Sequence, residues 1–161
     1  MASVVTVANN YSSSSCTVTN PSNAYNDTTN TTFAVMSFTL SNGYCDFKGF
    51  DFSSIPGGSV INSITYKASV FCGYLGWTLT TRAYINGNLK ASASFTKTSR
   101  TVKTLTISDS ATLAELKAAS SNNYFRVTIN SAKDGMAACG FDITVNYTPP
   151  TGNPLFFGMN F

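Results

Sequence analysis

Apolar and polar residues alternate along much of this chain. The clearest stretch is residues 58–72, where one parity carries Val60, Ile64, Tyr66, Ala68, Val70 and Cys72. The same period of two returns in residues 125–130 and 141–147. This period is typical of strands with one buried face, and such strands form antiparallel rather than parallel sheets.

Further strands are predicted at residues 32–40, 44–52, 77–85, 89–96 and 101–107. Asn86-Gly87 stands between two of them and predicts a tight hairpin, because both central residues of a type I′ turn need positive φ. One helical segment is expected, at residues 110–119, where Thr112 and Glu115 fit a capping box.

These elements predict an all-β fold, an antiparallel two-sheet β-sandwich with one short helix. We expect a single sandwich domain over residues 1–148 and a Pro-rich, then apolar, tail over residues 149–161. Residues 11–32 are rich in Ser, Asn and Thr and are interpreted as a long loop or an irregular entry to the domain.

The composition narrows the function classes. Ser, Thr and Asn make up more than a third of the chain, and charged residues only 11%. The net charge of +3 is dispersed, so no nucleic-acid partner is expected. No apolar run is long enough to span a membrane. The first ten residues lack the basic and apolar regions of a signal peptide, and we expect folding in a cytosol.

Catalysis is not expected. The chain has no His, which removes the commonest general base and the usual triads. Glu115 is the single Glu and is assigned to helix capping. The six Asp residues are scattered, so a catalytic carboxylate pair is not predicted.

Two weaker binding hypotheses come from oxygen ligands and aromatic residues. Asp27 in the early loop and Asp142 in the last strand suggest a structural Ca²⁺, the alternative being an Asx-turn and an outward strand residue. Aromatic side chains on a polar sheet suggest stacking on sugar rings. The candidates for glycan contact are Trp77, Tyr74 and Tyr84, with Tyr44 and Tyr124 as further ones. Trp77 equally fits the core.

Four cysteines, Cys16, Cys45, Cys72 and Cys139, are far apart and lack metal-site spacing. Buried thiols are the expected state, and a disulfide between Cys72 and Cys139 requires that their strands be neighbours. The apolar tail residues Leu155, Phe156, Phe157, Met159 and Phe161 either dock on a neighbouring subunit or fold back on the sandwich.

Several segments together resemble the jelly-roll β-sandwich domain of tailed-bacteriophage virion accessory proteins. They are residues 20–27, the Phe52-Ser-Ser-Ile-Pro-Gly57 turn that precedes the long strand, residues 124–129 and residues 140–147. The resemblance covers roughly residues 16–148. It implies that the first and last strands lie close together and that the long strand pairs with the last, which would bring Cys72 near Cys139. It also places Asp27 and Asp142 where related carbohydrate-binding jelly rolls hold calcium.

The resemblance implies a non-enzymatic accessory role on a virion made in the host bacterial cytoplasm. The first hypothesis is a capsid decoration, head-fibre or neck protein. It would form homo-oligomers and contact other virion proteins of the capsid, neck or tail. The second is a carbohydrate- or host-receptor-binding adhesion module that attaches to a host surface glycan. A binding domain of a bacterial extracellular protein is the third. No cofactor is expected beyond the calcium considered above.

Overall fold

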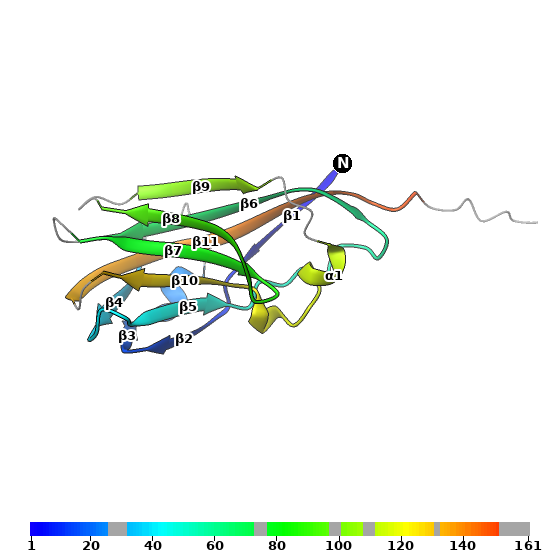
Figure 1. Ribbon diagram of the computed structural model, residues 1–161. Helices are drawn as coiled ribbons and strands as arrows, with labels where there is room; N and C mark the ends of the chain where they lie inside the picture. The colour runs from blue at the N-terminus through cyan, green and yellow to red at the C-terminus, as the bar shows by residue number, and fades with distance from the viewer. Residues whose placement is uncertain (26–31, 73–76, 97–100, 108–111, 131–132, 152–161) are drawn as a thin grey trace, which may run out of the picture.

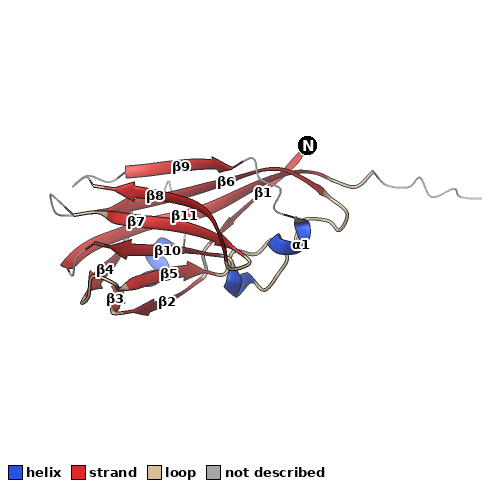
Figure 2. Ribbon diagram, viewed as in Figure 1, coloured by secondary structure: helices blue, strands red, loops and turns tan. Residues whose placement is uncertain are grey.

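The chain folds as two antiparallel sheets packed face to face (Figures 1 and 2). The computed structural model describes residues 1–25, 32–72, 77–96, 101–107, 112–130 and 133–151, with the backbone alone for 101–107 and 133–135. In these ranges no helix is long and apolar enough to cross a membrane.

The first sheet is organised around the last strand, β11 (Lys133–Thr148), which pairs with the long strand β6 (Val60–Phe71) along most of its length. The other edge of β11 pairs with two strands in succession, β4 (Ala34–Phe38) and β1 (Ala2–Val7). The sheet is completed at its two sides by β3 (Cys16–Thr19) and β9 (Thr101–Ile107).

The second sheet has a simpler order, with each strand antiparallel to its neighbours. Across the sheet the strands are β2 (Asn10–Ser14), β5 (Tyr44–Lys48), β10 (Tyr124–Ile129), β7 (Leu79–Ile85) and β8 (Asn88–Phe95). The hairpin between β7 and β8 turns at Asn86 and Gly87, both with positive φ, as the sequence predicts.

The predicted antiparallel sandwich of jelly-roll type is confirmed, and so are two pairings that the resemblance implies. The first described strand lies against the last, with Ala2 opposite Tyr147, and the long strand lies against the last, with Ile64 opposite Val145. In the second half of β11 the inward residues Phe141, Ile143 and Val145 are apolar, while the residues between and after them, Asp142, Thr144 and Asn146, are polar. The alternation in the sequence therefore reports the buried face correctly.

Two expectations about the strands are wrong. Residues 11–32 are not simply a loop, because β2 and β3 occupy most of Asn10–Thr19, where Ser and Thr fill outward positions and weaken the alternation. The strand predicted at 44–52 ends at Lys48, because the next residue, Gly49, has a φ of 87° and so leaves the extended conformation. Only glycine fits at this position, since an added Cβ would also collide with Asn9. The chain then leaves the sheet at Phe50.

The core between the sheets is rich in aromatic side chains. The ring of Phe141 in β11 stacks on Phe47 of β5 at 4.6 Å and lies 5.1 Å from Phe125 of β10. Phe125 also makes edge contacts with Phe50 and with Tyr66 of β6. Because these contacts join strands of both sheets, they fix the position of β5 and β10 and thereby of their outward side chains.

Short helices lie outside the two sheets. The 3₁₀ turn η1 (Pro21–Ala24) contacts β4 and β11. The helix α1 (Leu113–Leu116) and the 3₁₀ turn η2 (Ser120–Asn122) lie at one end of the sandwich, at the start of β10 (Figure 2). The predicted capping box is confirmed: Glu115 donates its backbone N–H to Thr112, and its carboxylate accepts the backbone N–H of Thr112.

Candidate functional site

The outward surface of the second sheet carries aromatic and charged side chains in register. Inward residues of β7 are buried and outward ones are partly exposed, as the alternation requires. We call this surface the tyrosine face; its central residues are Tyr44, Asp46 and Lys48 of β5, Tyr124, Arg126 and Thr128 of β10, and Thr80, Arg82 and Tyr84 of β7.

Two tyrosines form a stacked pair on this face. Tyr124 is directly opposite Tyr84 in the pairing of β10 with β7, and their ring centroids are 4.6 Å apart with an angle of 14° between the planes. Each ring therefore covers one face of the other, and the guanidinium carbon of Arg126 lies 5.5 Å from the centroid of Tyr124 and 5.9 Å from that of Tyr84.

Arg126 occupies the centre of the tyrosine face. Its Nε and Nη2 donate to the two carboxylate oxygens of Asp46 at 2.7 and 2.8 Å. Its guanidinium carbon lies 4.1 Å from the ring centroid of Tyr44. The side chain of Asp46 is 4% exposed and that of Arg126 30%. A carboxylate this deeply buried needs such a pair, because an uncompensated buried charge is strongly destabilising.

The surroundings of Arg126 and Tyr124 determine the protonation state of each side chain. The hydrogen bond with Asp46 raises the pKa of Arg126, although partial burial acts in the opposite direction, so the guanidinium is charged at every physiological pH. Burial raises the pKa of Tyr124, with a smaller opposing effect of Arg126, so its hydroxyl keeps its proton. The face therefore offers aromatic rings, hydroxyl groups and cationic N–H donors.

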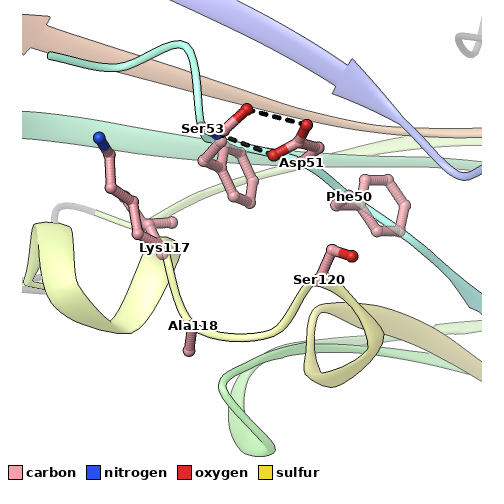
Figure 3. Close-up of a pocket in the computed structure, with 8 residues that line it drawn as sticks. Phe50, Asp51, Ser53, Lys117, Ala118 and Ser120 are labelled. Atoms are coloured by element: carbon pink, nitrogen blue, oxygen red, sulfur yellow. Dashed lines mark hydrogen bonds between the residues drawn. The ribbon is translucent and has the colours of Figure 1, made fainter.

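Apart from the tyrosine face, a cavity of about 330 Å³ lies at the end of the sandwich, between the segment after β5 and the segment after α1 (Figure 3). Phe50 and Phe52 contribute buried rings, and the polar rim includes Ser53, Lys117 and Ser120. Asp51 accepts hydrogen bonds from the backbone N–H and the hydroxyl of Ser53. Because both rings are buried, the cavity has no exposed aromatic face on which a ligand could stack.

The aromatic residues predicted to contact a glycan lie in different parts of the structure. Tyr84, Tyr44 and Tyr124 come together on the tyrosine face. Trp77 is partly buried and packs against the hydrophobic core, the alternative that the sequence left open. Tyr74 lies outside the described residues. The glycan contact predicted at Tyr84 is thus placed beside two further tyrosines.

The calcium hypothesis gains no support from the described residues. Asp142 is 2% exposed on β11, and the Nζ of Lys67 lies 4.0 Å from its carboxylate. A cation would have to compete with this lysine. The other expected ligand, Asp27, lies outside the described residues, and within those residues no group of three acidic, His or Cys side chains clusters.

All four cysteines are buried thiols, as expected. The register places Phe71 opposite Ala137 and Ser69 opposite Gly140. Cys72 directly follows the end of β6 and Cys139 lies at the irregularity in β11, so the two are not opposite each other. The Cys72 thiol instead donates to the carbonyl of Trp77. The hydrogen bond with Cys16, with burial as a smaller cause, raises the pKa of Cys45. The disulfide considered between Cys72 and Cys139 is not formed in this structure.

The tail predicted to dock on a neighbour, from Leu155 to Phe161, lies outside the described residues. The last described strand ends at Thr148, the position expected for the end of the sandwich. Tail docking stays a prediction.

Sequence reasoning missed the charged members of the tyrosine face. Asp46 and Arg126 are 80 positions apart, and their pairing depends on the register between β5 and β10. Alternation alone places Arg126 outward, next to inward Phe125 and Val127. It does not reveal which strand is its neighbour.

Comparison with known proteins adds information on the fold. No family model matches the chain, and no curated protein sequence matches it. Among solved structures, the C-terminal family 6 carbohydrate-binding module of a marine laminarinase from Zobellia galactanivorans has a TM-score of 0.50 with 10% identity, over 90% of this chain and 100% of that one.

Two further structures are similar to a lesser degree. A family 35 carbohydrate-binding module from Clostridium thermocellum has a TM-score of 0.49 and 14% identity, over 89% of this chain and 98% of that one. A family 6 carbohydrate-binding module of lichenase 5A from Cellvibrio mixtus, solved with cellotriose, has a TM-score of 0.46 and 13% identity, over 90% of this chain and 97% of that one. The Zobellia galactanivorans structure, at 10% identity, shows a shared sandwich fold and no more.

Proposed function

We propose that this protein is a non-catalytic glycan-binding module whose tyrosine face holds the sugar. The observation that carries the proposal is the arrangement of Tyr84, Tyr124 and Arg126, in which a stacked aromatic pair stands next to a fixed guanidinium. Sugars have apolar C–H faces that pack on aromatic rings and hydroxyl groups that accept hydrogen bonds from N–H donors.

Preorganisation supports the same proposal. Arg126 is fixed by Asp46 on one side and by the Tyr44 ring on the other, so it loses little rotamer freedom when a ligand binds. Binding sites are built this way because ordering side chains at an interface costs about 0.5–1.5 kcal/mol for each flexible one.

The fold is compatible with this proposal but is not evidence for it. The Zobellia galactanivorans structure is a carbohydrate-binding module by name, and a fold by itself does not assign a function. A catalytic role is disfavoured on chemical grounds, because the chain has no His and both oxygens of Asp46, the carboxylate on the tyrosine face, are engaged by Arg126.

The proposal is tested by isothermal titration after screening on a glycan array. Tyr84→Ala removes one ring of the stacked pair and should weaken binding of any hit at least about tenfold, or about 1.4 kcal/mol. Tyr84→Phe keeps the ring and should retain most of the affinity. Phe33→Ala is the matched control, since Phe33 is an exposed aromatic residue at the start of β4, away from the tyrosine face.

Equal affinities for wild type and Tyr84→Ala would place the glycan elsewhere. A blank array, with the protein shown to be folded, would reject the glycan proposal itself.

We further propose that this module acts on a bacteriophage particle, where it attaches the virion to a host surface glycan. The support is the sequence resemblance of residues 16–148 to virion accessory domains. The competing role is a decoration, head-fibre or neck protein that contacts other virion subunits and copies of itself. Localising the protein in a particle reconstruction and removing residues 149–161 distinguishes the two roles: attachment requires an outward tyrosine face, and decoration requires the tail for incorporation.

A further inference from the structure

The tyrosine face carries more positive charge than its ion pair uses. Asp46 neutralises Arg126, while Lys48 and Arg82 are on the same face, one on each side of β10. In the part of the chain that the structure describes, no carboxylate lies within 4.0 Å of either side chain, and the ion pairs there are made by other cations. The face therefore has a net excess of two positive charges.

Arg82 is placed directly opposite Arg126 in the pairing of β7 with β10. Like charges in directly opposite positions destabilise a sheet, so folding gives no reason for this pair. Arg82 donates from Nη1 to the hydroxyl of Thr128 at 3.2 Å, its one hydrogen bond among the described side chains. The remaining N–H donors of its planar fork are left for a ligand.

The second cation is Lys48, directly opposite Tyr124 in the pairing of β5 with β10. Its Nζ lies 5.9 Å from the centroid of the Tyr124 ring. Lys48 therefore lies beside the tyrosine pair on its β5 side.

Arg82 is also close to the apolar surface around Tyr84. Leu89 of β8 is directly opposite Tyr84 and is 55% exposed, so an exposed apolar side chain lies beside the tyrosine pair on this side. Arg82 is two residues before Tyr84 on the same face, about 7 Å along the strand. A single sugar ring that packs against Tyr84 thus comes within reach of the Arg82 guanidinium.

From this juxtaposition we infer that the glycan is acidic and that Arg82 binds the carboxylate of a uronic-acid residue stacked on Tyr84. A guanidinium fork matches the planar carboxylate with two parallel hydrogen bonds. Lys48 adds a second positive charge on the far side of Tyr124, which suits a chain with repeated acidic residues. This inference rests on the proposed glycan function and names the class of sugar for the same site.

The experiment uses pairs of oligosaccharides that differ in charge alone. Gluco-, galacto- and mannuronic oligomers are each titrated beside their carboxyl-reduced, neutral counterparts and beside sulfated neutral oligomers of the same length. The wild type should bind at least one acidic oligomer at least about tenfold more tightly than its reduced counterpart. Raising the salt concentration should reduce this preference.

Variants then assign the preference to Arg82. Arg82→Gln should abolish the preference for the acidic oligomer and keep the residual affinity for the neutral one, and Arg82→Lys should restore it in part. Lys117→Gln is the matched control: it removes the same charge from an exposed position at the end cavity and should leave the preference intact.

The outcomes separate the two proposals. Equal binding of acidic and reduced oligomers overturns the acidic inference and leaves the glycan module standing. Tighter binding of the sulfated oligomers than of every uronate also overturns it. An acidic preference that survives in Arg82→Gln contradicts the role of this residue. No binding of any of these oligomers, with a hit on the glycan array, overturns the acidic inference alone, whereas a blank array rejects both proposals.

Discussion

The carboxylate of Asp46 and the guanidinium of Arg126 form a two-point ion pair on neighbouring strands, with N–O distances of 2.7 and 2.8 Å. The pair couples the stability of the second sheet to the geometry of its outward face. The carboxylate side is almost fully buried, whereas the guanidinium side is partly exposed and lies 4.1 Å from the ring centroid of Tyr44.

Removing Arg126 should destabilise the fold more than removing the whole pair. Arg126→Met leaves the buried Asp46 carboxylate without its counter-ion and should lower the free energy of unfolding by about 2 kcal/mol, less than for a fully buried pair because Arg126 is partly exposed. The double variant Asp46→Asn, Arg126→Met removes the stranded charge and should recover part of this loss. Urea denaturation measures both. A double variant no more stable than Arg126→Met would contradict this explanation.

Asn123 ties together three segments at the start of β10. Its side-chain oxygen accepts the backbone N–H of Asn86, and its Nδ2 donates to the carbonyls of Leu116 and Phe50. Because the residue is fully buried, Asn123→Ala leaves several groups without partners and should cost about 1–3 kcal/mol of stability. The neighbouring exposed residue supplies the control, since Asn122→Ala should change stability by less than about 0.5 kcal/mol. Equal effects of the two variants would remove the structural role assigned to Asn123.

Glu115 has two separable roles, in the capping box and in an ion pair with Lys90 of β8, 3.8 Å away. Glu115→Ala removes both and should lower thermal stability by about 1 kcal/mol at the melting temperature. Glu115→Gln keeps the capping oxygen and should lie close to wild type, because the ion pair with Lys90 is only partly buried and spans 3.8 Å, and such a pair contributes little. If Gln proves as damaging as Ala, the ion pair and not the cap stabilises this end of the sandwich.

Alkaline pH should destabilise the protein through its tyrosines. Burial raises the pKa of Tyr124 and of Tyr25 above their ordinary value of 10.0 in the folded state. The unfolded chain therefore loses these protons first, and the free energy of unfolding falls as pH rises from the ordinary pKa toward the folded one. Tyr124→Phe should flatten this decline above about pH 10 and leave the pH dependence near neutrality unchanged. An identical slope in both proteins between pH 10 and 11 would contradict the shift.

The fold could be predicted from the sequence where strands have one apolar face. β6, β10 and the second half of β11 alternate cleanly because their inward residues fill the core. Strands β2 and β3 could not be predicted from the sequence. They lie at the edges of their sheets and carry Ser and Thr at most positions. Their burial is shallow, so the hydrophobic pattern that identifies a strand is weak there.

The candidate site was predicted in part. Tyr84, Tyr44 and Tyr124 were recognised as outward aromatic residues, whereas Trp77 packs against the core. The charged residues between the tyrosines were not recognised, because the pairing of Asp46 with Arg126 is set by strand register across 80 positions. A local pattern fixes the face on which a side chain lies but not its neighbour across the sheet.

The central claim is that a glycan lies on the outward face of the second sheet. Titrating the labelled protein with the tightest-binding oligosaccharide while recording backbone and side-chain NMR shifts tests it directly. The account predicts that the largest shifts fall on Tyr84, Tyr124 and the Nε–H of Arg126, with the end cavity at Ser53 and Lys117 unchanged. Shifts concentrated at that cavity or around Trp77, with the tyrosine face silent, would contradict it.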